Sequence, residues 1–220
     1  MNKAMNALHR ALAEANTVLL TGPMDPDGDS IGACLALARA AETFSSATVH
    51  VAGELNYRYA WIPDAERVMA DDALADAYDL VVVMDGDRGR LTPRVTALFE
   101  SAASTALVDH HQSSSEDGYD VVLLNPASPS TCEMVYNILV SWGIGLNSAI
   151  ATHLYTGVIF DTGGFKHENT RAETHRLAAE LLEQGVQPAP VHAKVLHERT
   201  MAGLRLLGEV LGSAVFYGDG

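Results

Sequence analysis

The sequence predicts an α/β fold, a Rossmann-like and mostly parallel sheet with helices on both faces. Short apolar runs rich in Val and Thr alternate with helical patterns along the chain, and this alternation is typical of βαβ units. The run at residues 80–84 is apolar throughout, as expected for a strand buried on both faces of a parallel sheet. The 220 residues suffice for one large domain, or for one domain and part of another.

The elements follow from these patterns in chain order. We expect strands at residues 18–21, 47–52, 80–84, 105–108 and 119–124. An amphipathic helix is expected at the N-terminus, with further helices at residues 31–41, 65–77, 91–103, 130–142, 148–157 and 174–183. The helix at 130–142 has clear start and stop signals, Pro129-Ser130-Thr131 and Gly143. After a Pro-rich break, residues 191–211 predict a connecting helix and residues 213–217 the start of a strand.

Composition narrows the class of protein. The formal net charge of −14 argues against a broad basic surface for long duplex nucleic acid. Cys34 and Cys132 lie in apolar helical patterns without a Cys-x-x-Cys motif, which favours buried free thiols over a disulfide. No apolar run approaches membrane-spanning length, and the N-terminus does not resemble a signal peptide. We therefore expect a cytoplasmic protein with no membrane partner.

Acidic and histidine side chains follow four apolar runs. One Asp after a strand is usually a helix cap, but four clusters at corresponding positions favour a metal site. The carboxyl ends of parallel strands share one edge, so the first three clusters should converge, whereas the fourth lies past a helix. Carboxylates with imidazoles suit Mn²⁺ and comparable divalent ions, and two adjacent ions need a bridging carboxylate. The clusters are Asp25, Asp27 and Asp29; Asp85; Asp109-His110-His111; and Asp161.

These residues resemble the motifs of the DHH phosphoesterases. The resemblance covers roughly residues 10–211 and is strongest to the nanoRNase and pAp-phosphatase branch, which includes cyclic-di-AMP phosphodiesterases. It implies a Mn²⁺-dependent hydrolase that opens short oligonucleotides, pAp or cyclic dinucleotides by two-metal water activation. Its partner would be a small nucleotide, with short single-stranded nucleic acid also open. The matching segments are Pro26-Asp27-Gly28-Asp29-Ser30-Ile31-Gly32, Asp85, Asp109-His110-His111 and residues 154–165.

The resemblance also implies a role for each site residue. Asp27 would bind the first metal and Asp85 would bridge both. Asp29, His110 and Asp161 would complete the second. In the catalytic pair, His111 would face the substrate phosphate and Asp109 would orient the triplet.

One position departs from the family pattern. The family has a histidine four residues before Asp27, and this chain has Pro23 there. Proline has no side-chain donor, so we expect the first metal site to be weak or vacant unless Asp25 or water supplies the missing ligand.

The domain organisation is also an expectation from the resemblance. It implies a DHH catalytic domain at residues 1–186, a linker helix at 187–212 and the start of a truncated C-terminal substrate-binding domain at 213–220. Members of this branch carry a DHH-associated domain with a Gly-Gly-Gly-His motif, which these 220 residues lack. The isolated domain is therefore expected to be weakly active or inactive.

Several alternatives stay open. Another DHH activity, inorganic pyrophosphatase or single-strand exonuclease, would use the same metals, whereas a non-catalytic nucleotide-binding module is made plausible by Pro23. Arg88 and Arg90 are either phosphate ligands or solvated loop residues, and residues 165–170 are candidates for substrate contact. His153 is expected to be a packed histidine. No substrate-binding residue is assigned, and a homodimer is left open.

Overall fold

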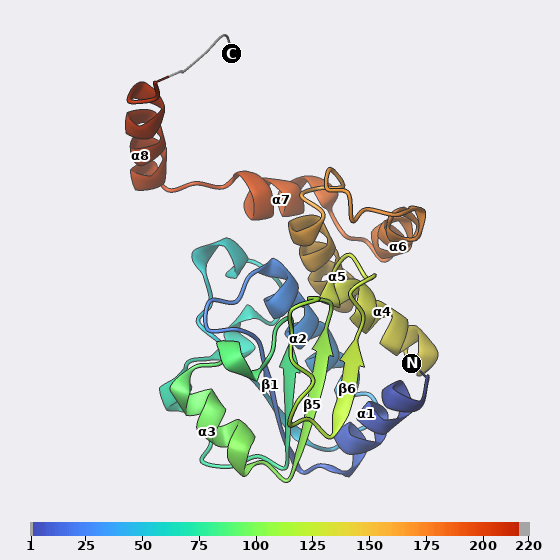
Figure 1. Cartoon of the computed structure of the whole chain (residues 1–220). Coiled ribbons are helices and arrows are strands. Elements are labelled where there is room, and N and C mark those ends of the chain that lie inside the picture. Colours follow the sequence, from blue (N-terminus) through green and yellow to red (C-terminus); the bar gives the residue numbers. More distant parts are fainter. Residues whose placement is uncertain (1, 216–220) are drawn as a thin grey trace.

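One six-stranded sheet forms the centre of the computed structural model, which describes residues 2–215. The strand order is β3-β2-β1-β4-β5-β6, and every neighbouring pair runs parallel (Figure 1). The α/β fold with a parallel sheet is therefore confirmed. The strands are β1 (Thr17–Thr21), β2 (Thr48–Ala52), β3 (Val68–Met69), β4 (Leu80–Met84), β5 (Ser104–Asp109) and β6 (Val121–Leu124).

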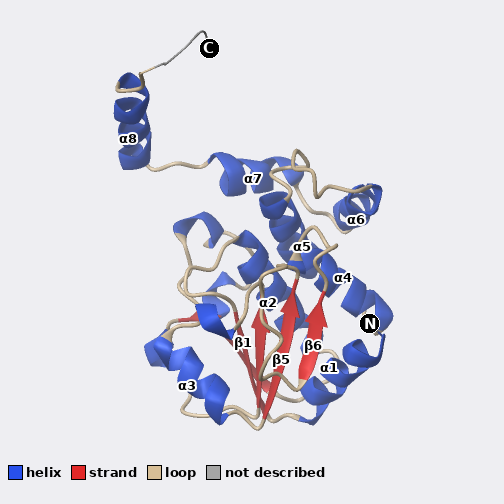
Figure 2. Cartoon of the chain, in the orientation of Figure 1, coloured by secondary structure: helices blue, strands red, loops and turns tan. Residues whose placement is uncertain are grey.

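Helices cover both faces of the sheet (Figure 2). Alternate residues of β4 explain this, because successive side chains of a strand point to opposite faces: Val82 and Met84 join the larger core, Val81 and Val83 the smaller. The larger core is shared with α1 (Asn2–Glu14), α2 (Gly28–Ala41), α4 (Thr131–Ser141) and α5 (Ser148–Asp161). The smaller one is shared with α3 (Pro93–Ser101), and α6 (Ala172–Glu183) packs against α5.

The strand order reverses between β1 and β4. β1 leads outward to β2 and β3, and β4 leads the opposite way to β5 and β6. In doubly wound sheets such a switch point leaves a crevice at the carboxyl ends of the strands, where ligands bind. Asp27, Asp85 and Asp109 lie at these ends of β1, β4 and β5.

The prediction of a helix at residues 65–77 is wrong. The structure has two single 3₁₀ turns, Ala65–Arg67 and Asp71–Ala73, with β3 between them. Val68 and Met69 pair in parallel with Val51 and Ala52 at the edge of the sheet. Pairing with a strand far away in sequence thus overrides a local pattern of good helix formers.

The fourth cluster also differs from expectation. Helix α5 does not end near Gly157 but continues to Asp161, so Asp161 lies at the carboxyl end of a helix rather than of a strand. Its approach to the sheet edge is therefore set by the packing of α5 against α2 and α4.

The predicted connecting helix at 191–211 is interrupted. Helix α7 (Pro188–His192) continues as a wider turn at Ala193–His197, and α8 (Met201–Gly212) begins separately, with Thr200 Oγ1 accepting from Gly203 N. This cap explains the break. All residues of α8 are exposed, and the helix stands clear of the sheet (Figure 1). Residues 213–215 form no strand, and Phe216 and Tyr217 lie outside the described residues.

Among residues 2–215, no helix combines the length and apolar character needed to cross a bilayer. Cys34 and Cys132 are buried free thiols, as predicted.

Candidate metal centre

The turn from β1 to α2 places two aspartates in different environments. Asp27 caps α2, and its Oδ1 accepts from the backbone N of Asp29 at 2.9 Å and of Ser30 at 3.1 Å. Asp29 lies in the first turn of α2 and is fully buried. Its Oδ2 accepts from Thr131 N at 2.6 Å and its Oδ1 from Cys132 N at 2.8 Å. The N-terminus of α4 therefore stabilises the charged carboxylate of Asp29.

Asp85 follows β4 in a strained backbone conformation. Its φ is +61°, which is uncommon for a residue with a side chain. Its backbone N still donates to Val108 O at 3.1 Å, and Thr131 Oγ1 donates to its Oδ1 at 3.2 Å. Strain of this kind persists where the surrounding structure fixes the residue, and it clusters at functional sites.

Asp109 organises the two histidines that follow it. Its Oδ1 accepts from the backbone N of His110 at 2.7 Å and from His111 Nδ1 at 2.7 Å. Burial opposes the charge of Asp109, but hydrogen bonds, above all from His111, hold the pKa of this carboxyl below its ordinary value. The same bond raises the pKa of His111. Asp109 Oδ1 thus binds both the backbone of His110 and the ring of His111.

The second ring nitrogen of His110 points into a group of carboxylates. Nδ1 lies 3.2 Å from Ser128 O, and since a carbonyl only accepts, Nδ1 must carry the proton of that bond. Nε2 lies 3.0 Å from Asp161 Oδ2, 3.6 Å from Asp85 Oδ1 and 3.9 Å from Asp29 Oδ2. The ring is therefore positioned by its partner nitrogen, as metal-binding histidines usually are.

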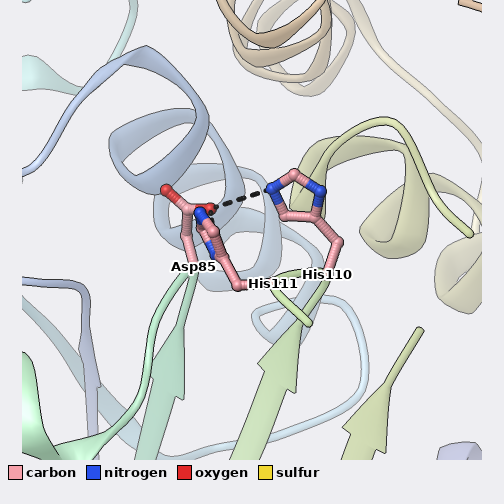
Figure 3. A group of neighbouring side chains, drawn as sticks. All are labelled: Asp85, His110 and His111. Atoms are coloured by element: carbon pink, nitrogen blue, oxygen red, sulfur yellow. Dashed lines mark ion pairs between the residues drawn. The ribbon is translucent and has the colours of Figure 1, made fainter. Parts of the chain in front are cut away.

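These atoms converge on one point, where His110 Nε2 lies within ion-pair distance of all three carboxylates. His110 Nε2 and Asp161 Oδ2 are buried and make no hydrogen bond of acceptable geometry, although they are 3.0 Å apart. One ligand atom from each of Asp29, Asp85, His110 and Asp161 lies within 4.8 Å of the others. Figure 3 shows Asp85 and His110 approaching one another from the ends of neighbouring strands, with His111 beside Asp85. This donor set fits a divalent cation.

A positive charge would stabilise the group formed by Asp29, Asp85, His110 and Asp161. Burial, followed by the charges of Asp161 and Asp85, raises the pKa of Asp29 well above its ordinary value. Although burial of the ring works in the other direction, the neighbouring carboxylates of Asp161, Asp85 and Asp29 raise the pKa of His110 to about 11. A proton on Nε2 or a metal ion would satisfy this site, so metal binding should release a proton.

Asp27 lies outside this group of four. Burial, and then the charge of Asp85, raise its pKa to about 7. Pro23 supplies no donor nearby, and the side chain of Asp25 is exposed. The structure therefore brings together the predicted ligands of the second ion, and Asp27, the predicted ligand of the first, stays outside this group.

Two sets of contacts at the site are not predicted by the sequence patterns. The backbone amides of Thr131 and Cys132 hold Asp29, and only the helix-start signal before α4 hinted at free amides there. Asn169 Nδ2 donates to both Pro129 O, at 3.1 Å, and Asp161 O, at 3.2 Å. It links the segment before α4 to the end of α5. His153 is buried and packed, with Nε2 2.8 Å from Pro63 O, and is no part of the site.

A doubly wound α/β domain with carboxylates and imidazoles gathered at its switch point defines a class of metal-binding domain. The family model described as "DHH family, N-terminal domain" matches residues 17–158. The chain therefore belongs to this family.

Curated relatives carry names of nucleotide hydrolases. The chain is 29% identical over 197 residues to the "Bifunctional oligoribonuclease and PAP phosphatase NrnA" of Thermus thermophilus, covering 90% of the chain and 59% of that protein. It is 26% identical over 180 residues to the "Cyclic-di-AMP phosphodiesterase GdpP" of Bacillus subtilis, covering 73% of the chain and 27% of that protein. The chain thus spans under two thirds of these relatives.

A solved structure shows the same fold. The exopolyphosphatase-related protein from Bacteroides fragilis superposes with a TM-score of 0.89 at 23% identity, over 99% of this chain and 67% of that one. At this identity the likeness concerns the fold alone.

Proposed function

We propose that this chain is the catalytic domain of a metal-dependent phosphoesterase that hydrolyses short oligoribonucleotides, pAp or cyclic dinucleotides. The observation behind the proposal is the convergence of Asp29, Asp85, His110 and Asp161 at the switch point of the sheet. The names of the NrnA and GdpP relatives support the substrate class.

In this proposal these four residues hold one ion, with Mn²⁺ as the expected metal. Such an ion supplies Lewis-acid stabilisation of phosphoryl charge and a water of lowered pKa. Asp27 would bind a first ion together with Asp85, which would then be a ligand of both ions. That ion would be held weakly because Pro23 contributes no imidazole.

His111 is the proposed proton donor to the leaving oxygen. Its Nδ1 is tied to Asp109 at 2.7 Å, so Nε2 is the ring nitrogen left for substrate. Because the bond to Asp109 raises the pKa of His111, a larger fraction of the ring is protonated near neutral pH. A protonated imidazole can donate to the leaving group or stabilise phosphate charge.

Pro23 favours a second candidate, a nucleotide-binding module without turnover. If two ions are required for hydrolysis, a weak first site would leave binding intact and remove catalysis. Location in the cytoplasm, homodimer formation and the domain boundaries at 186 and 212 stay predictions.

Release of phosphate from pAp by the 220-residue chain, with and without Mn²⁺, tests the proposal. We expect weak Mn²⁺-dependent turnover that EDTA abolishes, and a further fall in kcat of about 100-fold in His111→Asn, as for the loss of a general acid. Mn²⁺ affinity, measured by calorimetry, should be unchanged in this variant. Tight binding of Mn²⁺ and pAp without turnover would support the second candidate instead, and failure to bind Mn²⁺ would refute both.

A further inference from the structure

A cavity of about 350 Å³ lies next to Asp27. It is bounded on one side by the turn before α2 and on the other by residues 54–59, which follow β2. Phe160 also lines it, and the next residue in the chain is Asp161. The cavity therefore borders residues adjoining the metal centre on two sides.

The lining of this cavity is mixed, with apolar and aromatic side chains beside polar and charged ones. Pro26, Leu55, Tyr59 and Phe160 contribute to its lining. Tyr59 is 3% exposed, and its ring packs so closely on Gly28 that a Cβ there would lie 3.1 Å from Cε1. The aromatic wall is thus fixed in place and needs a glycine at the start of α2. Ligand cavities of this size usually combine such walls with a few directed polar groups.

The polar groups of the cavity are suited to a neutral ligand that can form hydrogen bonds. Asn56 Oδ1 accepts from Arg58 N at 3.1 Å. Because this bond uses the oxygen of the amide, Nδ2 is the atom left to donate to a ligand. Three carboxylates, Asp25, Asp27 and Glu54, line the cavity against a single guanidinium, that of Arg58. An excess of negative charge disfavours a phosphate inside the cavity. Within residues 2–215, Arg58 makes no ion pair.

We infer that this cavity binds the nucleoside of the substrate while the scissile phosphate lies at the metal centre. Pro26, Leu55 and Phe160 would contact the base and sugar, and Asn56 Nδ2 would donate to an acceptor on the base. The ligand class is a nucleoside monophosphate, which separates this site from that of an enzyme for pyrophosphate. This inference rests on the proposed function.

Binding of AMP and of inorganic phosphate in the presence of Mn²⁺ provides the test. AMP carries the nucleoside and phosphate does not, so we expect AMP to bind at least about tenfold more tightly to the wild-type chain. Leu55→Trp should fill the cavity and bring the two affinities within about twofold of each other, leaving that of phosphate unchanged. Leu182→Trp on α6, which replaces an exposed leucine remote from the cavity, is the matched control.

A second variant with a smaller change in side-chain size tests the inference in case Leu55→Trp fails to fold. Asn56→Ser retains a side chain able to cap Arg58 N but loses the amide donor, and we expect AMP affinity to fall about threefold or more while phosphate affinity stays. Equal binding of AMP and phosphate by the wild type, or an AMP preference that survives Leu55→Trp, would overturn the inference. Since pAp hydrolysis and Mn²⁺ affinity are measured on the same preparation, hydrolysis without any AMP preference would refute this inference alone. Absence of Mn²⁺ binding would instead refute the proposed function.

Discussion

Asp85 is the carboxylate common to the two groups of side chains in the candidate centre. It belongs to both groups of converging side chains, with His110 and His111 in one and with Asp29, His110 and Asp161 in the other. Its strained backbone, φ +61°, shows that the fold holds this carboxylate in one place. A bridging role between two ions would require such a shared position.

Asp85→Asn is predicted to weaken Mn²⁺ binding by at least about tenfold, because an amide is a poorer ligand than a carboxylate and loses one negative charge. Calorimetric titration measures the effect. Asp87→Asn is the control, since Asp87 lies two residues away and, among residues 2–215, its carboxylate accepts only from the backbone N of Gly89 and Ser115. Equal losses in the two variants would contradict a ligand role for Asp85.

Pro23→His is predicted to add a donor beside the first metal position. Imidazole binds Mn²⁺ and similar ions better than water does, so the number of ions bound per chain should rise toward two at equal free Mn²⁺. The stoichiometry from calorimetry decides this. If the wild type already binds two ions tightly, another group supplies the missing donor and the argument from Pro23 is wrong.

His153 gives the chain a pH-dependent stability of its own. Burial lowers the pKa of its ring to about 4, against an ordinary value of 6.5. Between these values the unfolded state binds the proton and the folded state does not, so stability falls as the pH drops from about 6.5 to 4, by about 3 kcal/mol.

His153→Gln should remove this dependence, because glutamine does not titrate and can still donate to Pro63 O. Urea unfolding at several pH values measures it, with His175→Gln, an exposed position, as the control. A variant with the same slope as the wild type between pH 6.5 and 4 would show that other groups, such as the carboxylates of the centre, carry the pH dependence.

At the scale of the elements, the start of α4 and the end of α5 form the second half of the centre. The first supplies two amides to Asp29, and the second carries Asp161. Asn169 links them through its two bonds to Pro129 O and Asp161 O. The position of Asp161 relative to Asp29 therefore depends on a residue that contacts neither carboxylate.

Asn169→Ala is predicted to lower Mn²⁺ affinity about tenfold, in the range found when groups behind metal ligands are removed. Asn137→Ala on α4 is the matched control, because its Nδ2 also donates to a backbone carbonyl, that of Glu133. Equal losses of melting temperature with a loss of Mn²⁺ affinity only in Asn169→Ala would support positioning. An unchanged Mn²⁺ affinity in Asn169→Ala would refute it.

The elements also show what a sequence can predict. Strands β4 and β5 could be recognised because burial on both faces demands a continuous apolar run. The segment around β3 could not, because Val68 and Met69 become a strand only through pairing with Val51 and Ala52. Likewise, the convergence of Asp29, Asp85 and His110 follows from their places at strand ends, whereas the approach of Asp161 depends on how α5 packs. Backbone donors such as Thr131 N cannot be predicted from residue types, because every residue except proline has a backbone N–H.

At the scale of the whole molecule, the four proposed ligands come from residues 29, 85, 110 and 161, at the ends of elements far apart in the chain. No short segment contains the site, so it exists only after α2, β4, β5 and α5 have assembled. Contacts of such long sequence separation form late, after the entropy of closing long loops has been overcome.

The order of events during folding follows from this separation. An ion that binds only the finished arrangement stabilises the native state without stabilising the transition state, so it should leave the refolding rate unchanged and slow unfolding. Stopped-flow refolding and unfolding in urea, at increasing Mn²⁺, measure both rates. In Asp85→Asn, Mn²⁺ should leave the unfolding rate unchanged as well. Acceleration of refolding by Mn²⁺ in the wild type would mean that part of the site forms early. If refolding is unchanged and unfolding slows, Mn²⁺ binds this chain only after folding is complete and lengthens the lifetime of the native state.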